Sequence, residues 1–127
     1  MKPTDALYIP DSSSISVMRS EFRLLGETMV LEVLYTLDSD GEAGFNAIKA
    51  RLGMTSSPGL SRGLKKLESS GMVARRVTGA SPPRVYYSLT QKGREFMNHL
   101  QSIVEWSGRW DNAEKSRVEV KIDTGKR

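Results

Sequence analysis

Basic and hydroxyl side chains are concentrated in the stretch from Thr55 to Gly71, TSSPGLSRGLKKLESSG. An arginine guanidinium can donate two parallel hydrogen bonds to the edge of a guanine base, and a lysine ammonium pairs with phosphate. Hydroxyl groups can bond to bases or phosphates. These residue types can therefore hold a polyanion, although an ordinary solvated face remains the alternative, and the candidates are Ser56, Ser57, Ser61, Arg62, Lys65 and Lys66.

Leucines at three- and four-residue spacing predict that this stretch is an amphipathic helix. The basic side chains fall largely off the apolar face, whose members are Leu60, Leu64 and Leu67. Residues that can cap a helix precede a proline at the expected start, and Gly71 stands where a C-cap glycine belongs. Gly59 and Gly63 each cost a helix interior about 0.5–1 kcal/mol relative to alanine. Either they let a neighbour or a ligand approach closely, or the helix is soft until it binds.

After Gly71 the periodicity changes from that of a helix to that of strands. Residues 72–77 and 84–89 are rich in β-forming side chains, and the loop between them, TGASPP, has turn composition. The two strands predict a hairpin with a basic tip that carries Arg75, Arg76 and Arg84. For Arg84 a pairing with a nearby acid is a substantial alternative to a role in binding.

The charge of the chain is strongly segregated along its length. Residues 1–44 carry three basic and eight acidic side chains, net −5, whereas residues 45–94 carry ten basic and one acidic, net +9. Residues 95–127 carry six of each and are neutral. Such segregation indicates a polyanionic partner for the middle segment, and a membrane surface is a weaker candidate.

Several classes of function find little support in the composition. The chain has no cysteine and one histidine, His99, so it offers no thiolate nucleophile, disulfide framework or multi-histidine metal site. It also lacks a Gly-rich phosphate loop and an apolar run of about 18 residues, and its first residues lack the apolar core of a signal peptide. We therefore expect a cytoplasmic protein that is not an enzyme, uses no cofactor or metal and does not enter a membrane.

The remaining segments predict helices around the basic centre. We expect an extended lead-in over residues 1–11 with a short strand at 6–9, a first helix from residue 12, and a buried helix over 27–37 that ends at a turn. A short helix over 45–52 and the basic helix make a helix-turn-helix over 45–71, and the hairpin follows over 72–89. A long helix over 90–110 completes a domain of residues 12–110. The polar tail, 111–127, has room for a short strand where Val118, Val120 and Ile122 alternate with charges.

Apolar side chains on the first and last helices exceed what one small domain needs to cover. We expect them to form a homodimer interface, with closed two-fold symmetry as the commonest arrangement. For the two tryptophans an effector pocket is an alternative, and no other feature supports an effector. The expected interface residues are Ile15, Met18, Phe22, Leu25, Leu100, Ile103, Val104, Trp106 and Trp110.

Two runs of this sequence resemble winged-helix transcription regulators of the MarR, ArsR and HxlR type. The first matches a Leu-x-x-x-Leu-x-x-Leu-Glu-x-x-Gly-Met-Val pattern over residues 60–73, and the second matches Tyr-Ser-Leu-Thr-x-x-Gly-Arg over residues 87–94. The helix that precedes the motif, from Leu25-Gly26 onwards, is also similar, so the resemblance covers roughly residues 20–107. This chain departs from the group in two ways. HxlR-type proteins usually carry a cysteine near the N-terminus, and this chain has no cysteine. ArsR-type metal sensors use Cys and His ligands, and that ligand set is missing too.

The resemblance implies an α+β, mainly α, winged helix-turn-helix whose extra N- and C-terminal helices form the dimer interface. It also implies sequence-specific binding to double-stranded DNA in transcription regulation. The recognition helix, residues 55–70, would enter the major groove, and the wing, residues 75–84, would contact the backbone or the minor groove. The alternative is a winged helix used for protein–protein contact in transcription or chromatin machinery, which would need no basic wing.

Overall fold

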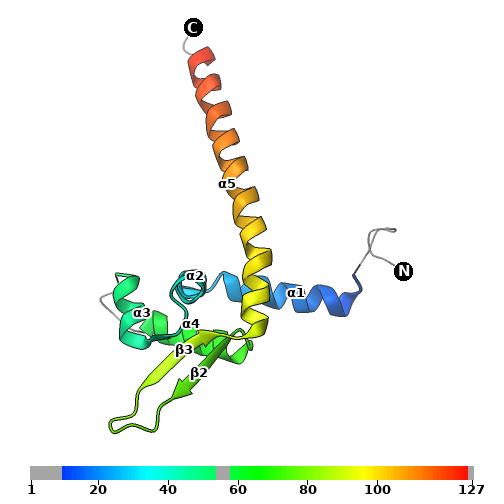
Figure 1. The fold of residues 1–127 in the computed structure, drawn as a ribbon. Helices are drawn as coiled ribbons and strands as arrows, with labels where there is room; N and C mark the ends of the chain where they lie inside the picture. Colours follow the sequence, from blue (N-terminus) through cyan, green and yellow to red (C-terminus); the bar gives the residue numbers. More distant parts are fainter. Residues whose placement is uncertain (1–9, 54–57, 126–127) are drawn as a thin grey trace.

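The computed structural model describes residues 10–53 and 58–125, with side chains as far as residue 114. These residues form five helices and a small sheet (Figure 1). Helix α1 spans Ser12–Leu25. Its N-cap is Asp11, whose side chain accepts a 2.8 Å hydrogen bond from the Ser14 amide, and this bond holds the pKa of Asp11 below its ordinary value. No residue of α1 is buried, so most of its apolar stripe remains open to solvent.

Helix α2, Val30–Asp40, is the central buried helix that the apolar run predicts, but its limits are shifted. It begins three residues later than expected because Met29 adopts a left-handed backbone conformation, φ 69°, that no sequence pattern announces. It continues through the predicted turn as far as Asp40, and Gly41, φ 76°, ends it. Asp40 is held there by an ion pair of 2.9 Å with Arg51 of the next helix.

Helices α3, Phe45–Arg51, and α4, Pro58–Ser69, confirm the two helices of the predicted helix-turn-helix. Residues 54–57, where the basic helix was expected to start, lie outside the described residues, and so does the strand expected at residues 6–9. At the other end of α4, Gly71 has φ 83°, the left-handed conformation that a C-cap glycine supplies without steric cost.

The hairpin is formed by β2, Val73–Val77, and β3, Val85–Leu89, as predicted. A third strand, β1, Ala43–Gly44, was not predicted, since two residues are too few to show a periodicity of two. All pairing is antiparallel in the order β1-β3-β2, and Gly44, Tyr86 and Arg76 lie in one row across the three strands. The arrangement of α3, α4 and the hairpin is a winged helix-turn-helix.

The core gathers side chains from α2, α3, α4, the base of the hairpin and the start of α5. Leu100 belongs to it with 4% of its surface exposed, so its placement in the dimer interface was wrong. Leu25 is partly buried against the same core, which corrects its assignment in part. Both residues lie on the side of their helix that faces the core. The most deeply buried members are Val30, Val33, Leu34, Ile48, Leu60 and Leu67.

Helix α5 spans Gln91–Gly125 and extends away from the rest of the chain as a long rod (Figure 1). The predicted end near Trp110 and the strand suggested at residues 118–122 were therefore wrong. The segment 111–124 contains no glycine or proline, so nothing local stops the helix, and its alternating valines do not override helix propagation. Within the described residues, no helix is long and apolar enough to cross a membrane.

Candidate nucleic-acid interface

Helix α4 separates its apolar and basic faces as the leucine spacing predicts. Leu60, Leu64 and Leu67 are buried, whereas Ser61, Arg62, Lys65 and Lys66 are exposed. Because the leucines fix the rotation of the helix, the side chains opposite them are presented to solvent as a row. Ser56 and Ser57, the other two candidates of this stretch, lie outside the described residues.

Gly63 allows α4 to pack closely against the turn between α1 and α2. A Cβ atom built on this buried glycine would lie 3.3 Å from the Thr28 carbonyl oxygen, closer than most neighbours tolerate. At Gly59 the nearest atoms are 3.7 Å away, an ordinary contact. Close approach of a neighbour therefore explains Gly63, and it fixes the distance between α4 and the end of α1.

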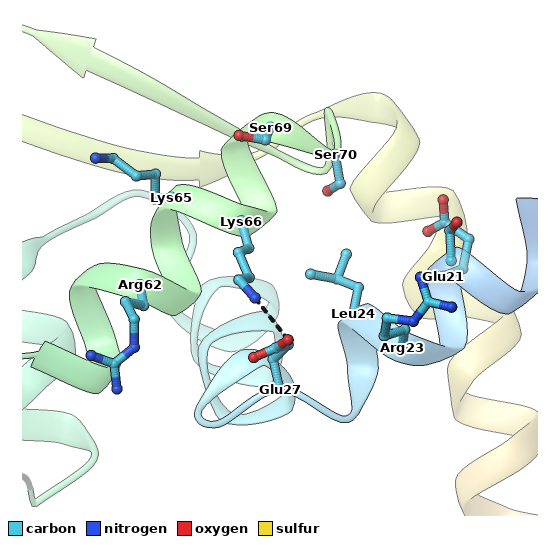
Figure 2. Close-up of a pocket in the computed structure, with 10 residues that line it drawn as sticks. Glu21, Arg23, Leu24, Glu27, Arg62, Lys65, Lys66, Ser69 and Ser70 are labelled. Atoms are coloured by element: carbon cyan, nitrogen blue, oxygen red, sulfur yellow. Dashed lines mark ion pairs between the residues drawn. The ribbon is translucent and has the colours of Figure 1, made fainter.

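A groove of about 590 Å³ lies between the C-terminal half of α1 and α4, with Leu24 and the Ser69–Ser70 end of α4 along its walls (Figure 2). Lys66 reaches across it to Glu27 in an ion pair of 2.7 Å. Arg62 and Lys65 extend from α4 away from this pair (Figure 2). Glu21 contributes a buried carboxylate oxygen that has no hydrogen-bond partner among the described residues.

Arg76 is held by contacts within the chain. Its guanidinium donates to both carboxylate oxygens of Glu42, at 2.9 and 2.7 Å, and lies 4.9 Å from the centre of the Tyr86 ring. The hydrogen bonds from Arg76 hold the pKa of Glu42 below its ordinary value, and the carboxylate raises the pKa of Arg76. The acid pairing considered for Arg84 is thus found at Arg76.

Arg75 and Arg84 are the remaining cations of the wing, and both are exposed. Neither takes part in the three ion pairs formed between described residues. Arg84 borders a second hollow of about 450 Å³, which Asn46 at the start of α3 also lines. Asn46 was not among the sequence candidates, because an isolated asparagine carries no pattern.

The glutamates that hold Lys66 and Arg76 were also missed at the level of the sequence. Glu27 and Glu42 belong to the acidic segment 1–44, and their partners belong to the basic segment 45–94. The opposite net charges of the two segments were the available signal. That signal shows that some pairs will form without identifying them.

The base of the wing is joined to the start of α5 by hydrogen bonds to three successive backbone carbonyl groups. Thr90 donates its amide to the Met72 carbonyl oxygen, 2.9 Å, and its hydroxyl to the Gly71 carbonyl oxygen. The Lys92 ammonium donates to the Ser70 carbonyl oxygen, 2.6 Å. These bonds link the C-terminal end of α4 to the first turn of α5.

Large apolar side chains are exposed along α1 and α5. The exposed fractions reach 58% at Phe22 and 56% at Trp106, and Val17, exposed by 60%, adds a member that the sequence candidates lacked. The other exposed members are Ile15, Met18, Ile103, Val104 and Trp110. Apolar surface of this extent commonly marks a site of contact with another protein.

Residues 24–115 match the HxlR-like helix-turn-helix family. A similar protein is an uncharacterized HTH-type transcriptional regulator of Methanothermobacter thermautotrophicus, 42% identical over 74 residues, which are 58% of this chain and 56% of that protein. The chain thus spans a little over half the length of that relative. The HTH-type transcriptional regulator YodB of Bacillus subtilis is 33% identical over 90 residues, 71% of this chain and 80% of YodB.

Solved structures show the same fold. The reduced form of the transcriptional regulator YodB from B. subtilis superposes with a TM-score of 0.66 at 30% identity, over 78% of this chain and 92% of that one. A MarR-family regulator from Enterococcus faecalis V583 gives a TM-score of 0.71 at 24% identity, over 88% and 97%, and supports the fold alone. This chain belongs to the HxlR-like helix-turn-helix family, whose named relatives are transcriptional regulators.

Proposed function

We propose that this chain, a transcriptional regulator of the helix-turn-helix type, binds duplex DNA with α4 in the major groove and the β2–β3 wing on the backbone or in the minor groove. The observation that carries the proposal is the set of exposed basic side chains on these two elements. Among described residues, Arg62, Lys65, Arg75 and Arg84 enter no ion pair. They are available to an external polyanion.

The proposed contacts are of two kinds: base contacts, which determine sequence preference, and phosphate contacts, which do not. Arg62 stands near the middle of the exposed face of α4, where a guanidinium can pair with guanine, and Ser61 lies beside it. Lys65, with Arg75 and Arg84 of the wing, holds phosphates. Ser56 and Ser57 remain proposed contacts at the start of the helix, and Lys66 and Arg76 need separate treatment because each is paired within the chain.

We further propose that the protein acts as a homodimer through α1 and α5. The exposed apolar residues on both helices support this, and Leu25 and Leu100 drop out because they face the protomer core. A two-fold dimer would place two copies of α4 on half-sites about one DNA turn apart. Because the proposed partner is duplex DNA, we propose a cytoplasmic location.

DNA affinity should fall steeply with salt concentration. Each phosphate that a cation neutralises contributes about −0.9 to the slope of log K against log salt concentration, so the three proposed phosphate contacts of each protomer predict a slope of about −2.7 per protomer bound. Fluorescence anisotropy with a labelled duplex, measured at several salt concentrations, provides the slope. A flat dependence, or no retention on random-sequence DNA at low salt, would contradict DNA binding and favour a protein–protein module.

Arg62→Ala should relax sequence preference. If Arg62 pairs with a guanine, its loss should cost about 1–3 kcal/mol of binding to the preferred site and little on other sequences. Selection of bound duplexes from a random pool identifies that site, and competition binding then compares the variants. Lys65→Ala is the matched control, because loss of a phosphate contact weakens all sequences alike. A uniform loss for Arg62→Ala would make Arg62 a phosphate contact instead.

A further inference from the structure

Two glutamates neutralise cations that belong to the DNA-facing elements. We infer that Glu27 and Glu42 limit the sequence-independent DNA affinity of this protein by holding Lys66 and Arg76 away from phosphates. The inference rests on the proposed DNA contact by α4 and the wing. Glu27 and Glu42 are then positioning residues. They do not touch DNA themselves, but they determine how many cations can reach the DNA backbone.

The first pair fixes Arg76 through three contacts from two neighbouring elements. Arg76 lies opposite Tyr86 in the strand register, and Tyr86 lies opposite Gly44, directly after the Glu42-Ala43 step. The guanidinium therefore crosses β3 above the Tyr86 ring and reaches Glu42 with two hydrogen bonds. A two-point hydrogen bond and a ring contact orient the group more firmly than a single charge pair does.

The alternation of side chains along β2 also separates Arg76 from the wing surface that carries Arg75. Neighbouring residues of a strand point to opposite faces, so Arg75 and Arg76 cannot both face one DNA backbone. Arg76 shares its face with Tyr86 and its acid, whereas Arg75 lies on the other face and enters no ion pair among described residues. Only one of the two wing arginines of β2 is therefore free to bind phosphate.

The second pair holds Lys66 on the flank of α4. Glu27 lies in the turn between α1 and α2, and its amide donates to the Leu24 carbonyl oxygen, 3.0 Å. The same turn is pressed against Gly63, so the carboxylate stands at a fixed distance from α4. Lys66 is directed towards this acid, while Arg62 and Lys65 extend away from it (Figure 2).

The consequence is a lower count of phosphate contacts than the basic sequence suggests. If Arg76 or Lys66 were released, each would add one phosphate contact per protomer. Each contact adds about 0.9 to the magnitude of the salt slope, equivalent to about eightfold in affinity at 0.1 M salt for each protomer bound. Phosphate contacts carry no sequence information, so the gain would apply to every duplex alike.

The experiment measures the salt dependence of binding to a random-sequence duplex for the full-length chain and its variants. Glu42→Gln and Glu27→Gln should each bind about eightfold more tightly per protomer at 0.1 M salt, with a slope steeper by about 0.9. In the double variants Glu42→Gln/Arg76→Ala and Glu27→Gln/Lys66→Ala the gain should disappear. Glu32→Gln on α2 is the matched control, because it removes the same charge from an exposed acid that is in none of the ion pairs between described residues.

The outcomes separate this inference from the proposed function beneath it. An unchanged slope in the single glutamine variants overturns the inference while wild-type binding keeps the proposed function intact. A gain that persists without Arg76 or Lys66, or that Glu32→Gln reproduces, overturns it as well, because the cause would then be general charge. Absence of DNA binding by the wild-type chain overturns the proposed function itself.

Discussion

Replacing Gly93 with alanine should lower the free energy of unfolding by about 2–3 kcal/mol, the upper range for an overpacked site. A Cβ atom at this position would overlap the Met72 carbonyl oxygen and would lie 3.3 Å from a methyl group of Leu89. The Met72 oxygen cannot move freely, because it accepts the 2.9 Å hydrogen bond from the Thr90 amide. Either that bond breaks or the first turn of α5 moves away from the base of the wing.

Chemical denaturation followed by circular dichroism measures this loss, and the same helix supplies its control. No described atom lies within 4 Å of a Cβ built on Gly108, which is also within α5. Gly108→Ala should therefore gain about 0.5–1 kcal/mol from helix propensity. Equal effects of the two substitutions would show that the contact between Gly93 and Met72 does not limit stability.

Trp106→Glu should convert the proposed dimer to a monomer at micromolar concentration. Trp106 is a large, half-exposed aromatic side chain on α5, and central aromatic residues of an interface commonly contribute 2 kcal/mol or more, on the order of a thirtyfold change in affinity. Placing a charge there also leaves that charge without a partner when the interface closes. Sedimentation or light scattering gives the mass in solution.

Loss of the dimer should weaken binding to a duplex with two half-sites by about 100-fold or more, because two linked sites gain affinity through effective concentration. Binding to a single half-site should stay nearly unchanged. Asn112→Glu is the matched control: it adds the same charge to α5 at a position separated from Trp106 by about 120° around the helix axis. A dimer that survives Trp106→Glu, or one that Asn112→Glu also disrupts, would contradict the proposed interface.

The sequence was sufficient to locate the parts of the fold that obey a local period. The leucine spacing at 60, 64 and 67 predicted α4 and its buried face, and the β-forming runs on either side of TGASPP predicted the hairpin. Strand β1 was not predicted, because it is only two residues long and is defined by its pairing with β3. The full length of α5 was not predicted, because the polar composition of residues 111–127 is typical of a tail, although no glycine or proline interrupts residues 111–124.

The sequence predicted which basic side chains of the candidate site are exposed, but not which of them form ion pairs within the chain. Exposure of Arg62, Lys65, Arg75 and Arg84 agrees with the sequence pattern, since each lies either off the apolar face of α4 or on the wing. The partners of Lys66 and Arg76 could not be predicted, since Arg76 and Glu42 are 34 positions apart and meet only when β1 joins the sheet. Leu100 shows the same limit in the core, because an apolar helix face does not reveal which part covers its own protomer.

The bonds from Thr90 and Lys92 to the end of α4 also bear on the geometry of any DNA site. They join α4 and α5 at the Ser70–Met72 corner, so α4 forms a short arm that moves together with α5. A rod of 35 residues is roughly 50 Å long, so a small change in the angle at which two such rods cross would swing the two short arms through several ångströms. In the proposed dimer, the spacing between the two half-sites would therefore depend on how the two α5 helices pack, far from the proposed base contacts of α4.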